Sequence, residues 1–180
     1  MTSVESHPGG LLLQGDIIRD VALIEDVREV HGHIEVSQIV FPLVIVLTQG
    51  CDLEQERGSR PKPTDDKTLI SVLCAPLYNV EHVFKGEHLS DLELRMQSIN
   101  RKKTEGRMLR QNRLARYHHL SFPSGIPIVD SAIDFKHYFS VSMSRLEEAR
   151  TERYVVTLGD LHRELLSQRF AAYLSRIGLP

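Results

Sequence analysis

The chain has 180 residues, of which 41% are hydrophobic and 26% are charged, and its formal net charge is −2. These proportions are typical of globular proteins, so they exclude disorder of the whole chain, and the length predicts a single domain over residues 1–180. Two cysteines, Cys51 and Cys74, are too few for a disulfide scaffold and favour a reducing compartment. The chain start lacks a signal-peptide pattern and no apolar run could cross a bilayer, so we expect a soluble, cytoplasmic protein that does not bind membranes.

The charge is distributed unevenly along the chain. Between Arg95 and Arg116 there are eight basic residues and one acidic residue, so this segment carries +7 and the remaining chain −9. Within it, the candidate binding residues are Arg101, Lys102, Lys103, Arg107 and Arg110. Such a basic run binds the phosphates of RNA or DNA, docks on an acidic protein partner, or forms a solvated helix face. No aromatic residue lies in this segment, so the stacking platform of single-strand binders is not expected there.

Three apolar stretches in the first third of the chain predict strands. The first is Ile17 to Ile24. The second, His33 to Val40, alternates in the way of a half-buried strand, and we expect Pro42 to interrupt it because proline lacks the ladder N–H. The third, Leu43 to Leu47, is continuous and rich in β-branched residues, which is typical of a strand buried on both faces.

The middle of the chain mixes loop, strand and helix patterns. Glu54 to Lys67 is polar and contains glycine and proline, so we expect a surface loop. Leu69 to Leu77 predicts another central strand, ended by Pro76. Four apolar residues between Leu89 and Ile99 are spaced as on one face of a helix, which Gly106 is expected to break.

The last third predicts further strands and the clearest helix. The expected elements are a strand over Arg113 to Leu120, an alternating strand over Ile133 to Met143, a helical turn over Ser144 to Arg150, and a strand over Arg153 to Leu158. Asp160 is expected to cap a helix from Leu161 to Ile177 that ends at Gly178. Its apolar stripe is expected to pack on the sheet or to pair with another subunit.

The order of these elements favours an α+β fold, because the strands cluster and do not alternate with helices. We expect a strongly bent antiparallel sheet or an SH3-like β-barrel, with a helical insertion and a C-terminal helix. The expected boundaries are 11–78 and 113–158 for the barrel core, 79–112 for the basic insertion and 159–178 for the C-terminal helix.

The segment Thr48 to Leu53 is the first candidate site, because a buried strand leads there into a polar turn with a glycine. Gln49, Cys51 and Asp52 are its candidate binding residues. As a nucleophile, Cys51 would need a stabilised thiolate, which the neighbouring carboxylate of Asp52 opposes. In the structural interpretation, Gln49 and Asp52 hydrogen-bond backbone groups of the turn and Cys51 packs inward.

The histidines indicate a metal site only weakly. A four-ligand set could be drawn from His31, His33, His118, His119, His137, Cys51, and Asp130 or Asp134. No spacing enforces that set, and neither HExxH nor CxxC is present, so we predict no metal and no cofactor. The phosphate-binding GxxxxGK[ST], the dinucleotide-binding GxGxxG and the hydrolase GxSxG patterns are also absent.

The sequence shows two resemblances, of which the first would cover most of the chain. Leu47 to Leu53, part of a V-L-T-Q-x-C-D-L motif, and Leu166 to Pro180 resemble uncharacterised bacterial proteins often met near mobile or defence genes. More distantly, Gly15-Asp16-Ile17-Ile18 resembles the opening strand of MazF/PemK-type toxins, and Pro42 to Thr48 resembles their Arg-Pro-Ala-Val-Val-Val-Ser/Thr strand. The second resemblance implies an SH3-like barrel, a homodimer, and RNA cleavage in which Thr48 is catalytic.

Phe41 stands where that family has the arginine that serves RNA cleavage. Phosphate transfer needs a cationic donor for the developing negative charge. We therefore predict a non-catalytic module that binds nucleic acid or a protein partner, as an accessory of a bacterial toxin or defence system. The alternatives are an endoribonuclease that uses Thr48 and a relocated arginine, and a metal- or thiol-dependent enzyme centred on Cys51 with nearby histidines.

Overall fold

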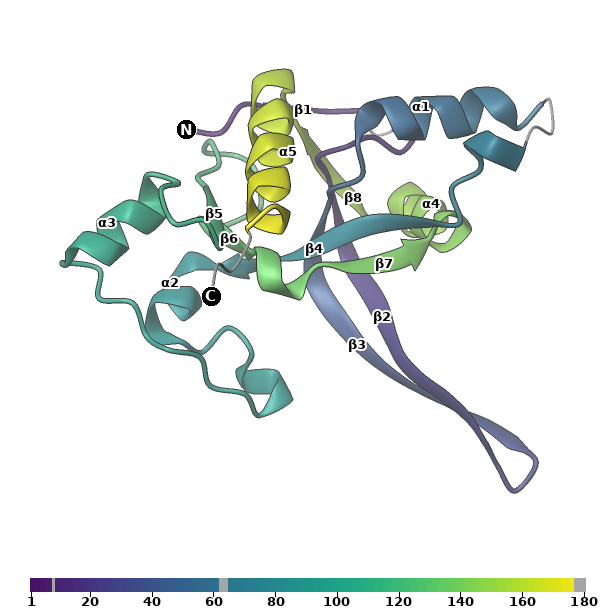
Figure 1. The fold of residues 1–180 in the computed structure, drawn as a ribbon, viewed down its shortest axis with the longest axis horizontal. Helices are drawn as coiled ribbons and strands as arrows, with labels where there is room; N and C mark the ends of the chain where they lie inside the picture. Colours follow the sequence, from purple (N-terminus) through teal and green to yellow (C-terminus); the bar gives the residue numbers. More distant parts are fainter. Residues whose placement is uncertain (8, 62–64, 177–180) are drawn as a thin grey trace.

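The computed structural model describes residues 1–7, 9–61 and 65–176, and its strands form one eight-stranded antiparallel sheet, strongly curled into a half-barrel (Figure 1). The spatial order is β1-β8-β2-β3-β4-β6-β5, and β7 pairs with β4. The strands are β1 (Val4–Glu5), β2 (Asp16–Val30), β3 (His33–Val46), β4 (Ser71–Asn79), β5 (Tyr117–Leu120), β6 (Ser131–Asp134), β7 (Phe139–Ser142) and β8 (Tyr154–Leu158). The α+β class, the bent antiparallel sheet and the C-terminal helix are thus confirmed.

Five α-helices and three 3₁₀ turns accompany the sheet in the described residues. The helices are α1 (Gly50–Ser59), α2 (Val80–Lys85), α3 (Thr104–Arg110), α4 (Met143–Arg153) and α5 (Asp160–Leu174). The 3₁₀ turns are η1 (Asp65–Lys67), η2 (Ser90–Leu92) and η3 (Phe135–His137). None of these helices is both long and apolar enough to span a membrane.

Alternate residues of the central strands build two cores on opposite faces of the sheet. Ile18 and Val44 face a core that includes Leu146 of α4. Ile17 and Ile45 face another core, which is closed by α5. A third, smaller core around Phe84 and Leu109 supports the segment that carries α2 and α3. The sheet therefore holds α5 on one face and α4 on the other.

Strands β2 and β3 form a long hairpin that projects beyond the rest of the sheet (Figure 1). Its two turn residues, His31 and Gly32, have φ angles of 51° and 78°, which match the strand twist of a tight hairpin. The side chains from His33 to Gln38 are exposed. The predicted strand is confirmed as part of β3, but its predicted half-burial is wrong there, because this part of the hairpin extends past the elements that would cover it.

Two prolines were expected to end strands, and both lie inside strands. Between the paired residues Val21↔Phe41 and Arg19↔Leu43 lie Pro42 and Asp20, and Asp20 has a φ of 51°. This local irregularity accommodates the missing N–H of Pro42, so β3 continues through it. Pro76 likewise pairs with Val44 inside β4.

The helix expected over Leu89–Ile99 is wrong, since only η2 is helical there. Gly86 ends α2 with a φ of 74°, and the chain then folds back along α2. The N–H of Met96 donates to the carbonyl of Gly86 at 2.9 Å, and that of Ile99 donates to the carbonyl of Phe84 at 2.8 Å. The apolar residues of this segment nevertheless pack against the third core, as their spacing required.

Gly106 lies within α3 and does not break it. A Cβ atom at this position would lie 2.5 Å from Arg101 Cα and 2.6 Å from the Asn100 carbonyl oxygen, so α3 could not keep its place. We expect Gly106→Ala to lower the free energy of unfolding by about 1–3 kcal/mol, measured by urea unfolding. Gly58→Ala in α1 is the control, because outside its own helix backbone its Cβ would meet no atom of the described residues within 4 Å. Equal stability of the two variants would contradict this packing.

Several other predicted elements have different boundaries in the structure, and two are confirmed. The loop expected over Glu54–Lys67 is wrong in part, since its first residues continue α1 and its last residues form η1, with residues 62–64 outside the described residues. The strand expected over Ile133–Met143 is divided by η3 into β6 and β7. Of the strand expected over Arg113–Leu120, only β5 forms. The helical turn at Ser144–Arg150 is confirmed as α4, and the strand at Arg153–Leu158 as β8.

The C-terminal helix α5 begins one residue before its expected start, with Gly159 as its N-cap in place of Asp160. Of its apolar stripe, Leu166 and Phe170 are buried, whereas Leu161 is 73% exposed and Leu174 is 51% exposed. The sheet therefore covers only part of the stripe. The helix ends at Leu174 with Ser175 as its C-cap, earlier than the expected end at Ile177, and Ile177 and Gly178 themselves lie outside the described residues.

Candidate functional site

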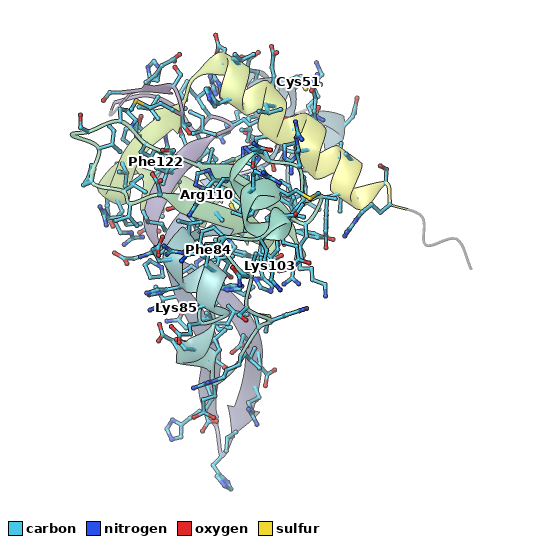
Figure 2. All side chains as sticks on the ribbon, turned by 90° about the vertical axis from the view of Figure 1, so that its left-hand side faces the viewer. Cys51, Phe84, Lys85, Lys103, Arg110 and Phe122 are labelled. Atoms are coloured by element: carbon cyan, nitrogen blue, oxygen red, sulfur yellow. The ribbon has the colours of Figure 1, made fainter. Side chains whose placement is uncertain are left out.

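The five basic residues predicted as binding residues lie together around α3. Arg101, Lys102, Lys103, Arg107 and Arg110 line one open hollow of about 810 Å³, with Thr104, Glu105 and Gln111. We call this surface the basic hollow. All five basic side chains are exposed (Lys103 and Arg110 are labelled in Figure 2). This arrangement is consistent with the prediction that the five residues contribute to one binding surface.

Two of these arginines are held in place by an aromatic ring. The guanidinium groups of Arg101 and Arg110 lie 5.0 Å and 5.1 Å from the centre of the Phe84 ring. Arg101 also pairs with Glu81 of α2. Lys102, Lys103 and Arg107 have no acidic partner within salt-bridge distance in the described part of the chain. The hollow thus presents several uncompensated positive charges.

The segment around Thr48 lies elsewhere on the molecule, where β3 leads into α1. The hydroxyl oxygen of Thr48 accepts a hydrogen bond from the Leu73 N–H at 2.7 Å, which ties the end of β3 to β4. Thr48, Gln49 and Asp52 line a pocket of about 300 Å³ together with α5 residues that include Phe170 and Leu174. No cationic side chain is among the described residues that line this pocket.

Cys51 lies in the first turn of α1 and is exposed, so the expectation that it packs inward is wrong. Its Sγ lies 3.6 Å from Gln49 Oε1 and 3.8 Å from Asp52 Oδ1. Gln49 is the N-cap residue of α1 but makes no side-chain capping bond. Where a turn was expected, the helix α1 begins. Gln49 is the last extended residue, and its carbonyl accepts the first helical hydrogen bond, from the N–H of Leu53.

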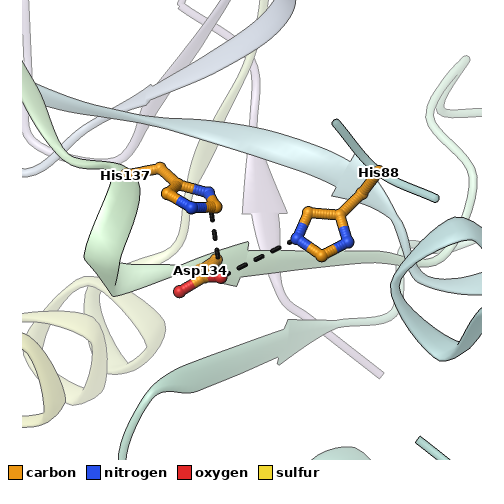
Figure 3. A group of neighbouring side chains, drawn as sticks. All are labelled: His88, Asp134 and His137. Atoms are coloured by element: carbon orange, nitrogen blue, oxygen red, sulfur yellow. Dashed lines mark ion pairs between the residues drawn. The ribbon is translucent and has the colours of Figure 1, made fainter. Parts of the chain in front are cut away.

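A second cluster, not predicted as a site, consists of His88, Asp134 and His137 (Figure 3). Their ligand atoms all lie within 4.8 Å of one another, and among the described residues no other such group of three His, Cys, Asp or Glu occurs. We call it the His–Asp cluster. Asp134 ends β6 and caps η3 by accepting the Lys136 N–H at 3.1 Å, which sets His137 three residues away. His88 reaches them from the loop between α2 and η2.

The surroundings of the His–Asp cluster are polar and buried. Arg116 Nε donates to the two carboxylate oxygens of Asp134 at 2.8 Å and 3.0 Å. The Tyr78 hydroxyl hydrogen-bonds His137 Nδ1 at 3.1 Å. The side chains of His88 and Asp134 are 1% and 0% exposed. Neither ring nitrogen of His88 has a hydrogen-bond partner among the described residues, which is uncommon for a buried polar group.

The electrostatics of this cluster keep the carboxylate charged. Burial alone would raise the pKa of Asp134, but the neighbouring His88 and Arg116 outweigh it, so that pKa lies well below its usual value. Burial lowers the pKa of His137 despite the attraction of Asp134. Burial and the charge of Asp134 raise the pKa of Tyr78. Near neutral pH, the cluster therefore contains an ionised Asp134, a neutral His137 and a neutral Tyr78.

The basic hollow and the buried His–Asp cluster are neighbours. A small pocket of about 170 Å³ is lined by Glu105, which also lines the basic hollow, and by Arg116, which binds Asp134. Of the metal set considered from the sequence, the structure brings together only Asp134 and His137. His31 and His33 lie at the hairpin end, and the buried His118 ring has no hydrogen-bond partner among the described residues. Sequence reasoning missed His88, Tyr78 and Arg116, because their contacts with Asp134 or His137 link separate segments and follow no motif.

Comparisons of the chain with protein-family models, with curated proteins and with solved structures found no match.

Proposed function

We propose that this chain is a non-catalytic module that binds nucleic acid through the basic hollow. The observation that supports this most directly is that all five predicted basic residues line one open surface. Exposed cationic side chains attract phosphate groups and release condensed counterions when they bind, so such binding is strongly salt-dependent.

The chemistry of the hollow favours contact with the phosphate backbone over reading of bases. Its lining consists of lysines, arginines, a threonine, a glutamine and a single carboxylate, that of Glu105. Phe84 lies beneath two of the arginines and is buried, so its ring is not free to stack on a base. We therefore expect affinity with little sequence preference.

We further propose that the half-barrel is a variant of the SH3-like barrel of MazF/PemK-type toxins, and that the module accompanies a toxin or defence system. The antiparallel succession of β2, β3 and β4, with Gly15-Asp16 at the start of β2, supports the fold relationship. The hydrogen bond that Thr48 accepts from Leu73 supports a structural role for this threonine, and so a binding function over RNA cleavage.

The test is a triple substitution of Arg101, Lys102 and Lys103 to glutamine. We expect its affinity for labelled RNA or duplex DNA to fall by about 10- to 100-fold near physiological salt. The slope of log affinity against log salt should become shallower by about 2–3, one step for each phosphate contact removed. Fluorescence anisotropy over a salt series measures both quantities.

The matched control replaces Arg28, Lys67 and Arg145 by glutamine. These three residues are also exposed but belong to β2, η1 and α4, away from α3 (Figure 1). The control has the same net charge as the test variant, so an equal loss of affinity in both would assign binding to overall charge and would refute the basic hollow. Undiminished nucleic-acid binding by the test variant would also refute the basic hollow as the binding surface. A wild-type chain that binds an acidic protein but no nucleic acid would refute the proposed ligand.

A further inference from the structure

We propose that His88, Asp134 and His137 bind a zinc ion. The proposal rests on the geometry of the His–Asp cluster and is independent of nucleic-acid binding. It concerns a site for which the sequence predicts no metal.

The distances within the cluster fit an ion better than they fit hydrogen bonds. His88 Nε2 and His137 Nδ1 each lie 3.7 Å from Asp134 Oδ2. That separation is too long for a hydrogen bond. It is close to the edge of about 3.3 Å between neighbouring ligands of a tetrahedral zinc ion with bonds of about 2.0–2.1 Å. All three ligand atoms lie within 4.8 Å of one another. An inward movement of the two rings would complete three bonds to one ion, with His137 Nδ1 exchanging its hydrogen bond with the Tyr78 hydroxyl for the metal.

The unpartnered state of His88 supplies an independent reason. Its side chain is 1% exposed, it faces Asp134 and His137, and neither of its nitrogens has a partner within the described chain (Figure 3). Leaving a buried polar group without a partner costs about 1–3 kcal/mol. A metal ion bound at Nε2 would satisfy this nitrogen.

The chemical types of the three ligands indicate which metal the site would bind. Two imidazoles and one carboxylate suit zinc and related transition ions, whereas calcium and magnesium prefer oxygen ligands alone. Three protein ligands leave a fourth position for water or for the Tyr78 hydroxyl, which lies 3.1 Å from His137 Nδ1. Arg116 acts as the outer partner that orients the carboxylate. Its positive charge opposes a second cation, so we expect weaker binding than at a site of thiolates.

A bound ion would join two parts of the fold. His88 belongs to the segment that carries α2 and α3, whereas Asp134 and His137 belong to β6 and η3. Zinc would therefore fix this segment to the sheet and stabilise the folded state by mass action.

The experiment uses the full chain without an affinity tag. Zinc content after purification, the shift in melting temperature on adding zinc to chelator-treated protein, and the absorption spectrum with cobalt as a substitute are measured. We expect one zinc per chain, a higher melting temperature with zinc, and a tetrahedral cobalt spectrum. His88→Gln and His137→Gln should each weaken zinc binding by more than about 10-fold.

The matched control is the double variant His31→Gln/His33→Gln, which removes two exposed histidines at the hairpin end, where zinc could bind adventitiously. This control should keep the zinc and the thermal shift. Loss of zinc in the control, or no thermal shift in the wild type, would overturn the proposal. If His88→Gln or His137→Gln fails to fold, the wild type and the control decide the question by themselves, because a zinc shift and a tetrahedral cobalt spectrum in both support it.

Discussion

Replacing Arg150 by alanine is expected to lower the free energy of unfolding by about 3–5 kcal/mol, because the substitution leaves a buried carboxylate without its partner. Arg150 Nε donates to Asp16 Oδ2 at 2.6 Å, and the two side chains are 3% and 0% exposed. The other guanidinium nitrogens donate to the carbonyls of Gly10 and His7 at 2.6 Å and 2.8 Å. One arginine of α4 therefore holds both β2 and the chain that precedes it.

The measurement is urea unfolding of Arg150→Ala beside Arg145→Ala, which removes an exposed arginine from the same helix. We expect the control to change stability by less than about 0.5 kcal/mol. A double variant, Asp16→Asn with Arg150→Met, removes both charges and should recover part of the loss. If Arg150→Ala and the control unfolded at the same urea concentration, the buried Arg150–Asp16 ion pair would not make the expected contribution to the free energy of unfolding.

Asp16 illustrates how a sequence motif and a structural role differ. The Gly15-Asp16 pair resembles the opening strand of a toxin family, yet its role in this structure is set by residues that are distant in the sequence. Gly15 has a φ of 79° and a Cβ there would lie 2.8 Å from Arg163 Cγ. The Asp16 carboxylate accepts hydrogen bonds from Arg150 and from the Thr157 hydroxyl, the latter at 2.6 Å. The sequence could predict a strand start here, but not the arginine that lies 134 positions away.

Local patterns predicted the elements whose residues bury one regular face. The stretches that became α4 and β8 are examples, since their short-range patterns agree with their burial. The polar helix α1 was missed because it buries only Leu53, Glu56 and Ser59, which leave little apolar periodicity to detect. The spacing from Leu89 to Ile99 predicted the correct buried residues but the wrong backbone, because hydrogen bonds to the end of α2 replace those of a helix.

The candidate sites follow the same division. The basic residues of the hollow were predictable because they are close together in the sequence, in α3 and in the three residues that precede it. The His–Asp cluster was not, because β6, η3 and the loop after α2 must all be in place before His88 meets Asp134. Asp134 and His137 were considered as ligands, but their partner could not be chosen from the other eight of the nine histidines without the fold.

Acid is expected to destabilise the protein through His118, and replacing this residue should remove much of that sensitivity. His118 is fully buried beside Phe135, with a distance of 6.2 Å between ring centres, and neither of its nitrogens has a side-chain or backbone partner in the described chain. Burial lowers its pKa to about 3, with further contributions from the positive charges of Arg169, His119 and His162. His118 is therefore neutral in the fold at pH values where the unfolded chain protonates it.

Because the folded pKa lies below the ordinary value of 6.5, protons bind preferentially to the unfolded chain, and stability falls as the pH drops from about 6.5 towards 3. From about pH 7 to about pH 4, this one group should cost about 3 kcal/mol. His119 and His137, whose pKa values are also lowered by burial, act in the same direction, so the difference between two variants isolates His118. Urea unfolding of the wild type and His118→Leu should therefore give curves of stability against pH that diverge by about 3 kcal/mol over this range. The control His33→Leu, at the exposed hairpin, should lose stability with falling pH as the wild type does. If the stability of His118→Leu also fell with pH as that of the wild type does, His118 would not be the cause of the acid sensitivity.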